Sequence, residues 1–149
     1  MRVRIETDDS LSDDEIVIRC NKLSDTIKKM EEIVRHENLL RQNLSFYKDS
    51  EEFFFPVFDV LFFETQDDSV YAHTANDAYK IRQKLSELCT ILPNEFVRIS
   101  KSTVLNTAHL MSIDKNITSS SLVRFKGSHK KVYVSRLYYK SLRQRLKLY

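Results

Sequence analysis

Short runs rich in β-branched and aromatic residues follow one another between polar breaks over most of this chain. They predict strands at residues 53–58, 60–65, 70–74, 78–82, 96–100, 109–114, 121–126 and 131–135. Because successive runs are separated by only a few polar residues, most of them are expected to pair as antiparallel hairpins. The predicted fold class is therefore mainly β, with a few short helices.

The turns between these runs must form almost without glycine, because the chain has one glycine and two prolines. Asn and Asp replace glycine in the breaks, and both tolerate left-handed backbone and cap local amides with their side chains. The predicted turns lie at 48–50, 66–69, 76–77, 116–121 and 126–129.

Three segments have helical rather than strand spacing. The first reads LSDTIKKMEEIVRH, residues 23–36, in which Ser24 is a candidate N-cap and Glu31 can pair with Arg35 one turn later. The second carries leucines at 85, 88 and 92 and should end at Pro93. The third is expected to begin after Ser135 and to run to the region of residue 146.

Residues 1–45 are interpreted as a small N-terminal α/β unit of regulation or dimerisation, ahead of a larger domain at 46–149. Strands are predicted at 3–7 and 15–20, followed by the first helix. The paired acids at 8–9 and 13–14 would suit a phosphoacceptor site, but that fold needs well over ~100 residues. We therefore interpret these acids as solvated turn residues.

Composition excludes several classes of protein. No apolar run approaches the roughly 20 residues that span a bilayer, and the first residues do not resemble a secretory signal, so a cytoplasmic protein is expected. Cys20 and Cys89 have no metal-ligand spacing; reduced, packed thiols are the simplest reading, with a disulfide or redox role as the alternative. The sequence contains neither a glycine-rich phosphate loop nor a recognisable nucleophile–base pair. We predict no enzyme activity, no cofactor and no metal.

The charges are strongly segregated along the chain. Residues 1–97 hold 12 Lys/Arg and 20 Asp/Glu, a net charge of 12 − 20 = −8, whereas residues 98–149 hold 12 Lys/Arg and only Asp114, a net charge of +11. Like charges repel on a compact surface, so this segregation favours a polyanionic ligand, nucleic acid above all. A solvated basic face that binds nothing in particular is the simpler alternative.

Two motifs lie within this basic part. In FVRISKSTVLN, residues 96–106, a strand pattern is interrupted by Lys101, Ser102 and Thr103, and in VYVSRLYYKSL, residues 132–142, a strand leads into the last helix. Together with LFFET at 61–65, His73-Thr74 and HLMSID at 109–114, they resemble the LytTR family of bacterial DNA-binding domains over about 46–146. The resemblance implies an elongated antiparallel β fold whose loops, rather than a recognition helix, enter successive major grooves of promoter DNA.

The resemblance also implies roles for individual residues. Lys101 and Arg136 occupy positions expected to read bases. The positions expected to contact phosphates are Ser100, Ser102, Ser135, Lys140, Lys84 and Lys115. Leu137 stands where some members of the family have a second base-reading arginine, and Asp67 and Asp68 lie where some place a cationic base contact. These two departures favour an alternative function, a basic protein-interaction module that docks on an acidic protein or membrane surface.

Several other polar residues have structural explanations. Arg98 can pair with Glu95 or Glu64 instead of DNA, and Asn106 is read as a turn or backbone cap. His73 and His109 are assigned to structure, and Lys130 and Lys131 to the solvated side of a hairpin. The expected partners are double-stranded promoter DNA and a second copy in a homodimer. By resemblance, a small membrane protein that restrains the regulator is a further possible partner.

Overall fold

The computed structural model describes residues 2, 4–12, 15–115 and 120–147, with the backbone alone described at 36–43. Its elements, in order, are α1 (Asp25–Asn43), β1 (Phe46–Lys48), β2 (Glu51–Phe53), the short helix η1 (Val57–Asp59), β3 (Phe62–Gln66), β4 (Ser69–His73), β5 (Ala78–Ile81), α2 (Leu85–Ile91), β6 (Phe96–Arg98), β7 (Thr103–Asn106), the short helix η2 (Thr107–His109), β8 (Leu110–Asp114), β9 (Ser121–Phe125), β10 (Lys131–Val134) and α3 (Arg136–Leu146).

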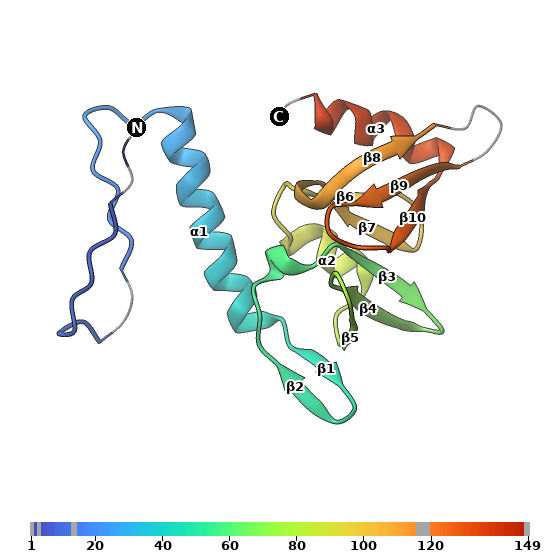
Figure 1. Ribbon diagram of the computed structural model, residues 1–149, viewed down its shortest axis with the longest axis horizontal. Coiled ribbons are helices and arrows are strands. Elements are labelled where there is room, and N and C mark those ends of the chain that lie inside the picture. The colour runs from blue at the N-terminus through green and yellow to red at the C-terminus, as the bar shows by residue number, and fades with distance from the viewer. Residues whose placement is uncertain (1, 3, 13–14, 116–119, 148–149) are drawn as a thin grey trace.

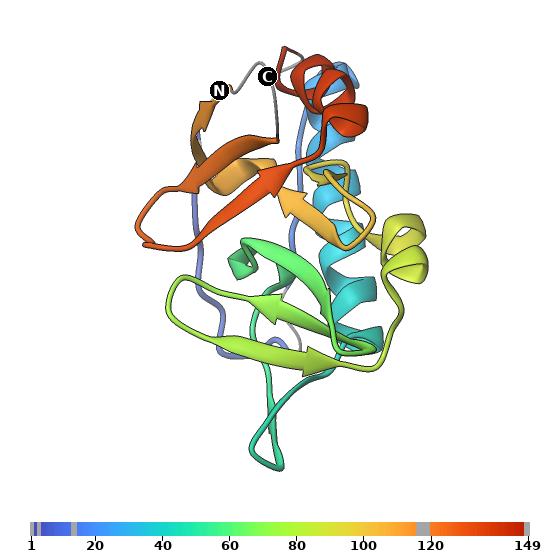
Figure 2. The same ribbon diagram turned by 90° about the vertical axis from the view of Figure 1, so that its right-hand side faces the viewer.

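The strands form two antiparallel sheets, which confirms the predicted fold class. Sheet A has the order β2-β1-β5-β4-β3-β7-β6, and sheet B has the order β10-β9-β8. Figure 2 shows sheet B above sheet A, with α1 behind them. Within the part of the chain that the structure describes, no helix is both long enough and apolar enough to cross a membrane.

Each face of sheet A contributes to a separate apolar core. Phe63 of β3 is fully buried in the first core, with residues of α2 and the start of β1, whereas its neighbour Phe62 faces the second core, between sheet A, sheet B and α3. Successive strand residues point to opposite faces, so β3 supplies both cores. Burial of a phenylalanine side chain stabilises a fold by about 1.5–3 kcal/mol.

The hairpin turns form where the polar breaks predict them. Asp49 and Ser50 join β1 to β2, and Asp67 and Asp68 join β3 to β4; all four have positive φ, between 48° and 69°. Two consecutive left-handed residues match the twist of a two-residue hairpin, a conformation that Asp tolerates better than most residues. Gly127, at φ 67°, serves the β9–β10 turn.

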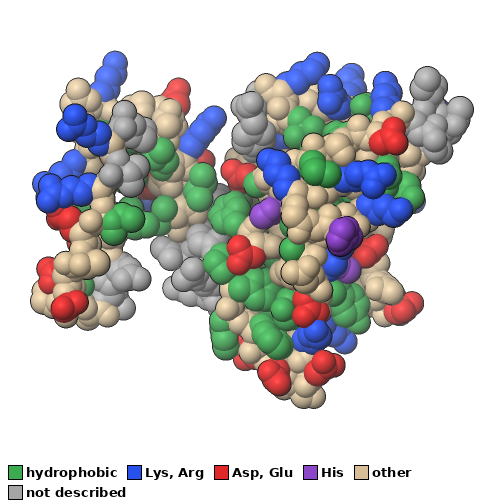
Figure 3. Space-filling view, viewed as in Figure 1, with side chains coloured by type: hydrophobic (Ala, Val, Ile, Leu, Met, Phe, Trp, Pro, Cys, Tyr) green, Lys and Arg blue, Asp and Glu red, His purple; other side chains and the backbone are tan. Residues whose placement is uncertain are grey.

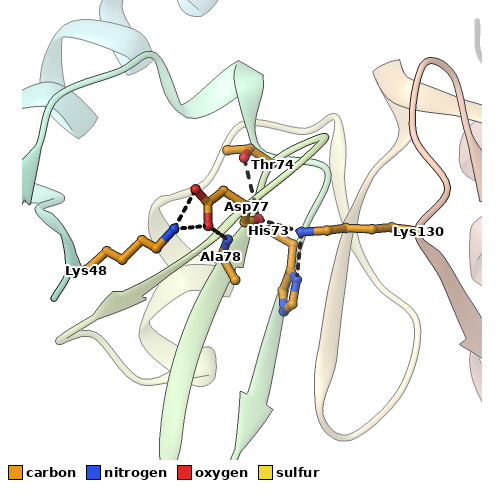
Figure 4. Close-up of polar contacts among 6 residues, drawn as sticks. All are labelled: Lys48, His73, Thr74, Asp77, Ala78 and Lys130. Carbon is orange, nitrogen blue, oxygen red and sulfur yellow. Dashed lines mark hydrogen bonds and ion pairs between the residues drawn. The ribbon is translucent and has the colours of Figure 1, made fainter.

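The two sheets are joined by a polar network at one end (Figure 4). Lys130, beside β10, donates to the carbonyl of Asp77 and lies 3.3 Å from Nδ1 of His73, while the carboxylate of Asp77 binds Lys48 from β1. Ser128 donates to the carbonyl of Ala75 at 2.7 Å. Lys130 is thus half-buried between the sheets; its predicted place on the solvated side of a hairpin is wrong, whereas Lys131 is exposed as predicted.

The three predicted helices are confirmed. Ser24 accepts a hydrogen bond from the amide of Ile27 at 3.4 Å, and Arg35 binds Glu31 at 2.6 Å. α2 is followed by Leu92 and Pro93, and α3 begins directly after Ser135.

Three details of the predicted fold are wrong. The strand predicted at 53–58 ends at Phe53, because Pro56 has no amide to donate and introduces η1. The strands β1 and β7 were not predicted. The N-terminal strands predicted at 3–7 and 15–20 are not formed by the described residues there, whose Ile16, Val17 and Ile18 are exposed. A strand needs a neighbour to satisfy its backbone, and the described residues of these segments pair with no strand.

The two cysteines are free thiols, and both are exposed rather than packed. Within the described residues, no group of His, Cys, Asp and Glu side chains is arranged to hold a metal ion.

Candidate nucleic-acid interface

The loop that joins β6 to β7, residues 99–102, presents Lys101 at its tip. Arg98, from the end of β6, donates from Nε to the carbonyl of Ser100 at 3.1 Å and from Nη2 to that of Lys101 at 2.6 Å. The amide of Thr65 binds the carbonyl of Ser102 at 2.8 Å. Three consecutive carbonyls are therefore satisfied from within the protein, and the loop is held in one conformation.

The loop serines contribute to this rigidity. The hydroxyl of Ser100 accepts from the amide of Ser102 at 3.2 Å and lies 3.3 Å from the hydroxyl of Ser102. Each hydroxyl keeps further hydrogen-bonding capacity toward a ligand. Lys101 is exposed, so the one long cationic side chain of the loop projects away from a braced backbone.

Arg98 has a role that the sequence did not suggest. Its guanidinium binds the loop backbone instead of Glu95 or Glu64. The feature of the sequence that could have indicated this role is the position of Arg98, two and three residues before the carbonyls it binds. From there the several N–H donors of its guanidinium can fold back onto a tight loop.

The start of α3 lies beside this loop. The amide of Ser135 donates to the carbonyl of Ile99 at 2.9 Å, which brings Ser135 and Arg136 next to Ser100 and Lys101. Arg136 is exposed, whereas the hydroxyl of Ser135 is buried and makes no hydrogen bond within the described residues. That hydroxyl would have to rotate before it could contact a phosphate.

The exposed face of α3 continues the cationic surface. Lys140 follows Arg136 by four residues and so lies on the same face of the helix, while Leu142 on the opposite face is fully buried. Lys115, after the end of β8, places its ammonium 5.3 Å from the ring centroid of Tyr139. Leu137 is 80% exposed next to Arg136, an uncommon position for a leucine.

Lys84 does not join this group. It precedes α2, beyond the end of β5, and β4 and β3 separate β5 from β7 in sheet A. Three steps between neighbouring strands amount to about 14 Å. The structure therefore brings Ser100, Lys101, Ser102, Ser135 and Arg136 together, places Lys140 and Lys115 along α3, and leaves Lys84 farther along the same edge.

An acidic turn lies on this edge between Lys84 and the Lys101 loop. The acidic β3–β4 turn lies at the lower right of Figure 1, where α3 begins above it. Figure 3 shows Lys and Arg atoms gathered over the upper part of the globular body and Asp and Glu mostly over the lower part. On this face of the molecule, the cationic and acidic residues are therefore separated in space as they are along the sequence.

Buried Asn106 and half-buried His109, at the far end of β7, have the structural roles predicted for them. The side-chain amide of Asn106 donates to the carbonyls of Phe58 and Val60, at 3.2 and 2.9 Å, and its oxygen accepts from the amide of Ala108. His109 contacts the carbonyl of Phe58 through Nε2.

His73 is held neutral between the sheets. Its ring stacks on Phe62 with centroids 4.2 Å apart, and burial, followed by the charge of Lys130, lowers its pKa to about 4. Glu64 lies 3.3 Å from Nε2, which would favour the protonated ring, but Nε2 makes no hydrogen bond in this geometry. Burial and Lys130 therefore dominate, and Nδ1 accepts from the ammonium of Lys130.

This predicts a loss of stability in mild acid. In the unfolded chain, the imidazole of His73 is protonated below its ordinary pKa of 6.5, whereas in the folded protein its pKa is about 4 and it stays neutral above that pH. The free energy of unfolding therefore falls as the pH is lowered through this interval. The loss is at most about 3 kcal/mol at pH 4. Urea unfolding between pH 7 and pH 4 should show it in the native protein and in His129→Phe, an exposed control, and much less in His73→Phe. Equal slopes in all three would contradict the assignment.

Comparison with known proteins settles the family. Residues 50–147 match the family model described as the LytTr DNA-binding domain. The chain belongs to the LytTR family. This confirms the resemblance, and the chain carries a DNA-binding domain over these residues.

Relatives and a solved structure agree with this assignment. Proteins from Staphylococcus aureus named as uncharacterized HTH-type transcriptional regulators are 35% identical over 104 residues in strain COL and 34% in strain MRSA252, covering 68% of this chain and 69% of theirs. The LytTr DNA-binding domain of a protein from Bacillus cereus, named as a methyl-accepting/DNA response regulator, superposes with a TM-score of 0.63 at 22% identity, over 68% of this chain and 94% of that one. The superposition supports the fold.

Proposed function

We propose that this LytTR protein is a transcriptional regulator that binds repeated sites in double-stranded promoter DNA, with loops entering successive major grooves. The relatives named as transcriptional regulators support this proposal. The observation that carries it is the loop at 99–102: Arg98 and Thr65 engage the carbonyls of Ser100, Lys101 and Ser102, while the Lys101 side chain extends into solvent.

The geometry suits the two kinds of contact that a protein makes with DNA, to phosphates and to bases. Phosphate contacts fix position, whereas a few long side chains on a rigid element distinguish bases in the major groove. Lys101 and Arg136, adjacent through the Ser135–Ile99 hydrogen bond, would read base edges. Ser100, Ser102, Lys140 and Lys115 would bind phosphates around them, with Ser135 joining after rotation of its hydroxyl.

Homodimerisation through residues 1–45 completes the proposal. α1 extends beside the domain (Figure 1), and Ile16 and Ile18 line a groove of about 260 Å³ with Val34 of α1. Such apolar surface suits self-association or a small restraining membrane protein.

Sedimentation equilibrium of the full chain tests the homodimer, and a monomer at micromolar concentration would contradict it. For the membrane partner, unchanged DNA affinity in the presence of membrane fractions would count against it.

The central claim is tested by selection from a pool of random duplexes, followed by competition. We expect an enriched sequence that is bound about 10³-fold or more tightly than random DNA. Ser102→Ala and Lys140→Ala should weaken binding of the selected and random duplexes to a similar degree, since phosphate contacts carry no sequence information. A basic protein-interaction module would show no enriched sequence, and that result would overturn the proposal.

A further inference from the structure

A second cationic surface lies on the same edge of sheet A, around a groove of about 560 Å³. Lys80, Arg82 and Lys84 line it, together with Tyr47 and, on the side of the β3–β4 turn, Asp68. Lys80 lies in β5, and Arg82 and Lys84 follow its end at two-residue spacing. We refer to this surface as the β5 groove.

Asp68 lines the β5 groove, but it forms no ion pair with the cations there. Elsewhere in the protein, Lys48 binds the carboxylate of Asp77 and Arg35 binds Glu31. Among the residues that the structure describes, neither Lys80, Arg82 nor Lys84 forms an ion pair with a carboxylate. Like charges gathered in this way repel one another, and an anion in the groove would relieve the repulsion.

The guanidinium of Arg82 is also held in place before any ligand binds. Its guanidinium lies over the ring of Tyr47, 4.9 Å from the centroid, so its position is restrained. A stacked guanidinium keeps its N–H edge available, and that edge matches the geometry of a phosphate. Arg82 and Lys80 are both exposed at their outer ends.

The position of the groove identifies the phosphate it would meet. Three strand-to-strand steps, about 14 Å, separate the end of β5 from the end of β7 that carries the Lys101 loop. The major groove of B-DNA is about 12 Å wide. With the Lys101 loop seated in that groove, the β5 groove therefore lies over the phosphate backbone beside it, outside the bases that the loop reads.

We propose that the β5 groove binds DNA backbone phosphates that flank the base pairs read by Lys101, through Lys80 and Arg82 together with Lys84. This rests on the proposed function, since it takes the Lys101 loop as the part that enters the major groove. Along a strand, two residues advance about 6.6 Å, so Lys80 and Arg82 can address different phosphates of one backbone. The contact adds affinity and sets the length of duplex that the protein covers, without reading sequence.

The test compares a selected duplex trimmed to its core with one extended on each side in turn, at several salt concentrations. For the extended duplex, the double variant Lys80→Gln/Arg82→Gln should lower the slope of log affinity against log salt by about 2, close to 0.9 per lost phosphate contact. Affinity for the trimmed duplex should be unchanged. Lys28→Gln/Lys29→Gln, which removes two exposed cations from α1, is the matched control and should keep the native slope.

The outcomes separate this inference from the proposed function. If no duplex is preferred over random DNA, the proposed function fails. If the preferred duplex is bound with the native salt slope by Lys80→Gln/Arg82→Gln, only the β5 groove proposal is overturned. In a second experiment, inorganic phosphate is titrated into the free protein, and the NMR signals of Lys80 and Arg82 are followed. Saturation by phosphate, with no effect of duplex length, would identify a small-anion site and would likewise overturn the proposal.

Discussion

Replacement of Asn106 with alanine should destabilise the protein by about 4 kcal/mol, because the three hydrogen bonds of its buried side chain are lost together. Asn106 is fully buried, and its side chain binds the carbonyls of Phe58 and Val60 and the amide of Ala108. Phe58 and Val60, in η1 and the segment before β3, lie 48 and 46 residues before Asn106, whereas Ala108 is in η2, which follows it directly. Alanine would leave all three groups without this partner, in a site that is at least partly buried.

Urea unfolding followed by circular dichroism measures this loss. Asn106→Asp should be at least as destabilising, because it keeps the acceptor but loses both donors and adds a buried charge. Asn94→Ala, at an exposed turn position, is the control and should stay within about 0.5 kcal/mol of the native protein. A change below about 1 kcal/mol for Asn106→Ala would show that these hydrogen bonds do not hold the domain together.

The double variant Lys101→Ala/Arg136→Ala should lose about 2–6 kcal/mol of specific DNA binding, since each base contact contributes about 1–3 kcal/mol. Both side chains are exposed and neither takes part in the core, so folding should be unaffected. Their losses need not add, because the two residues lie side by side across the Ser135–Ile99 hydrogen bond. Both single variants therefore belong in the same experiment.

The measurement is fluorescence anisotropy on the selected duplex and on a scrambled one. Lys126→Ala/Lys131→Ala removes the same charge from exposed positions at the opposite end of sheet B and is the matched control. Lys101→Ala/Arg136→Ala should lose the preference for the selected duplex, whereas the control variant should bind both duplexes slightly more weakly. An equal loss of affinity in the two double variants would mean that net charge, rather than the positions of Lys101 and Arg136, governs binding.

Much of the fold follows from local patterns. The hairpins of β3–β4 and β9–β10, the turn residues Asp67 and Asp68, and all three helices were predicted because spacing and turn chemistry act over a few residues. The N-terminal strands were wrongly predicted because the local pattern was the same, but the described residues at 4–7 and 15–20 pair with no neighbouring strand. β7 was missed because its first residue, Thr103, belongs to a polar run, although Thr103 is buried opposite Glu64.

The sequence by itself determined the chemistry of this protein: which residues are cationic, where the strands turn, and that Lys101 stands between two serines. Only the tertiary structure decided which of these residues meet. The packing of α3 against β6 brings Ser135 to Ile99, the order of strands in sheet A sets Lys84 apart, and the closeness of Lys130 to Asp77 joins the two sheets. Local propensity extends over a few residues, whereas these contacts depend on burying apolar faces that are distant in sequence.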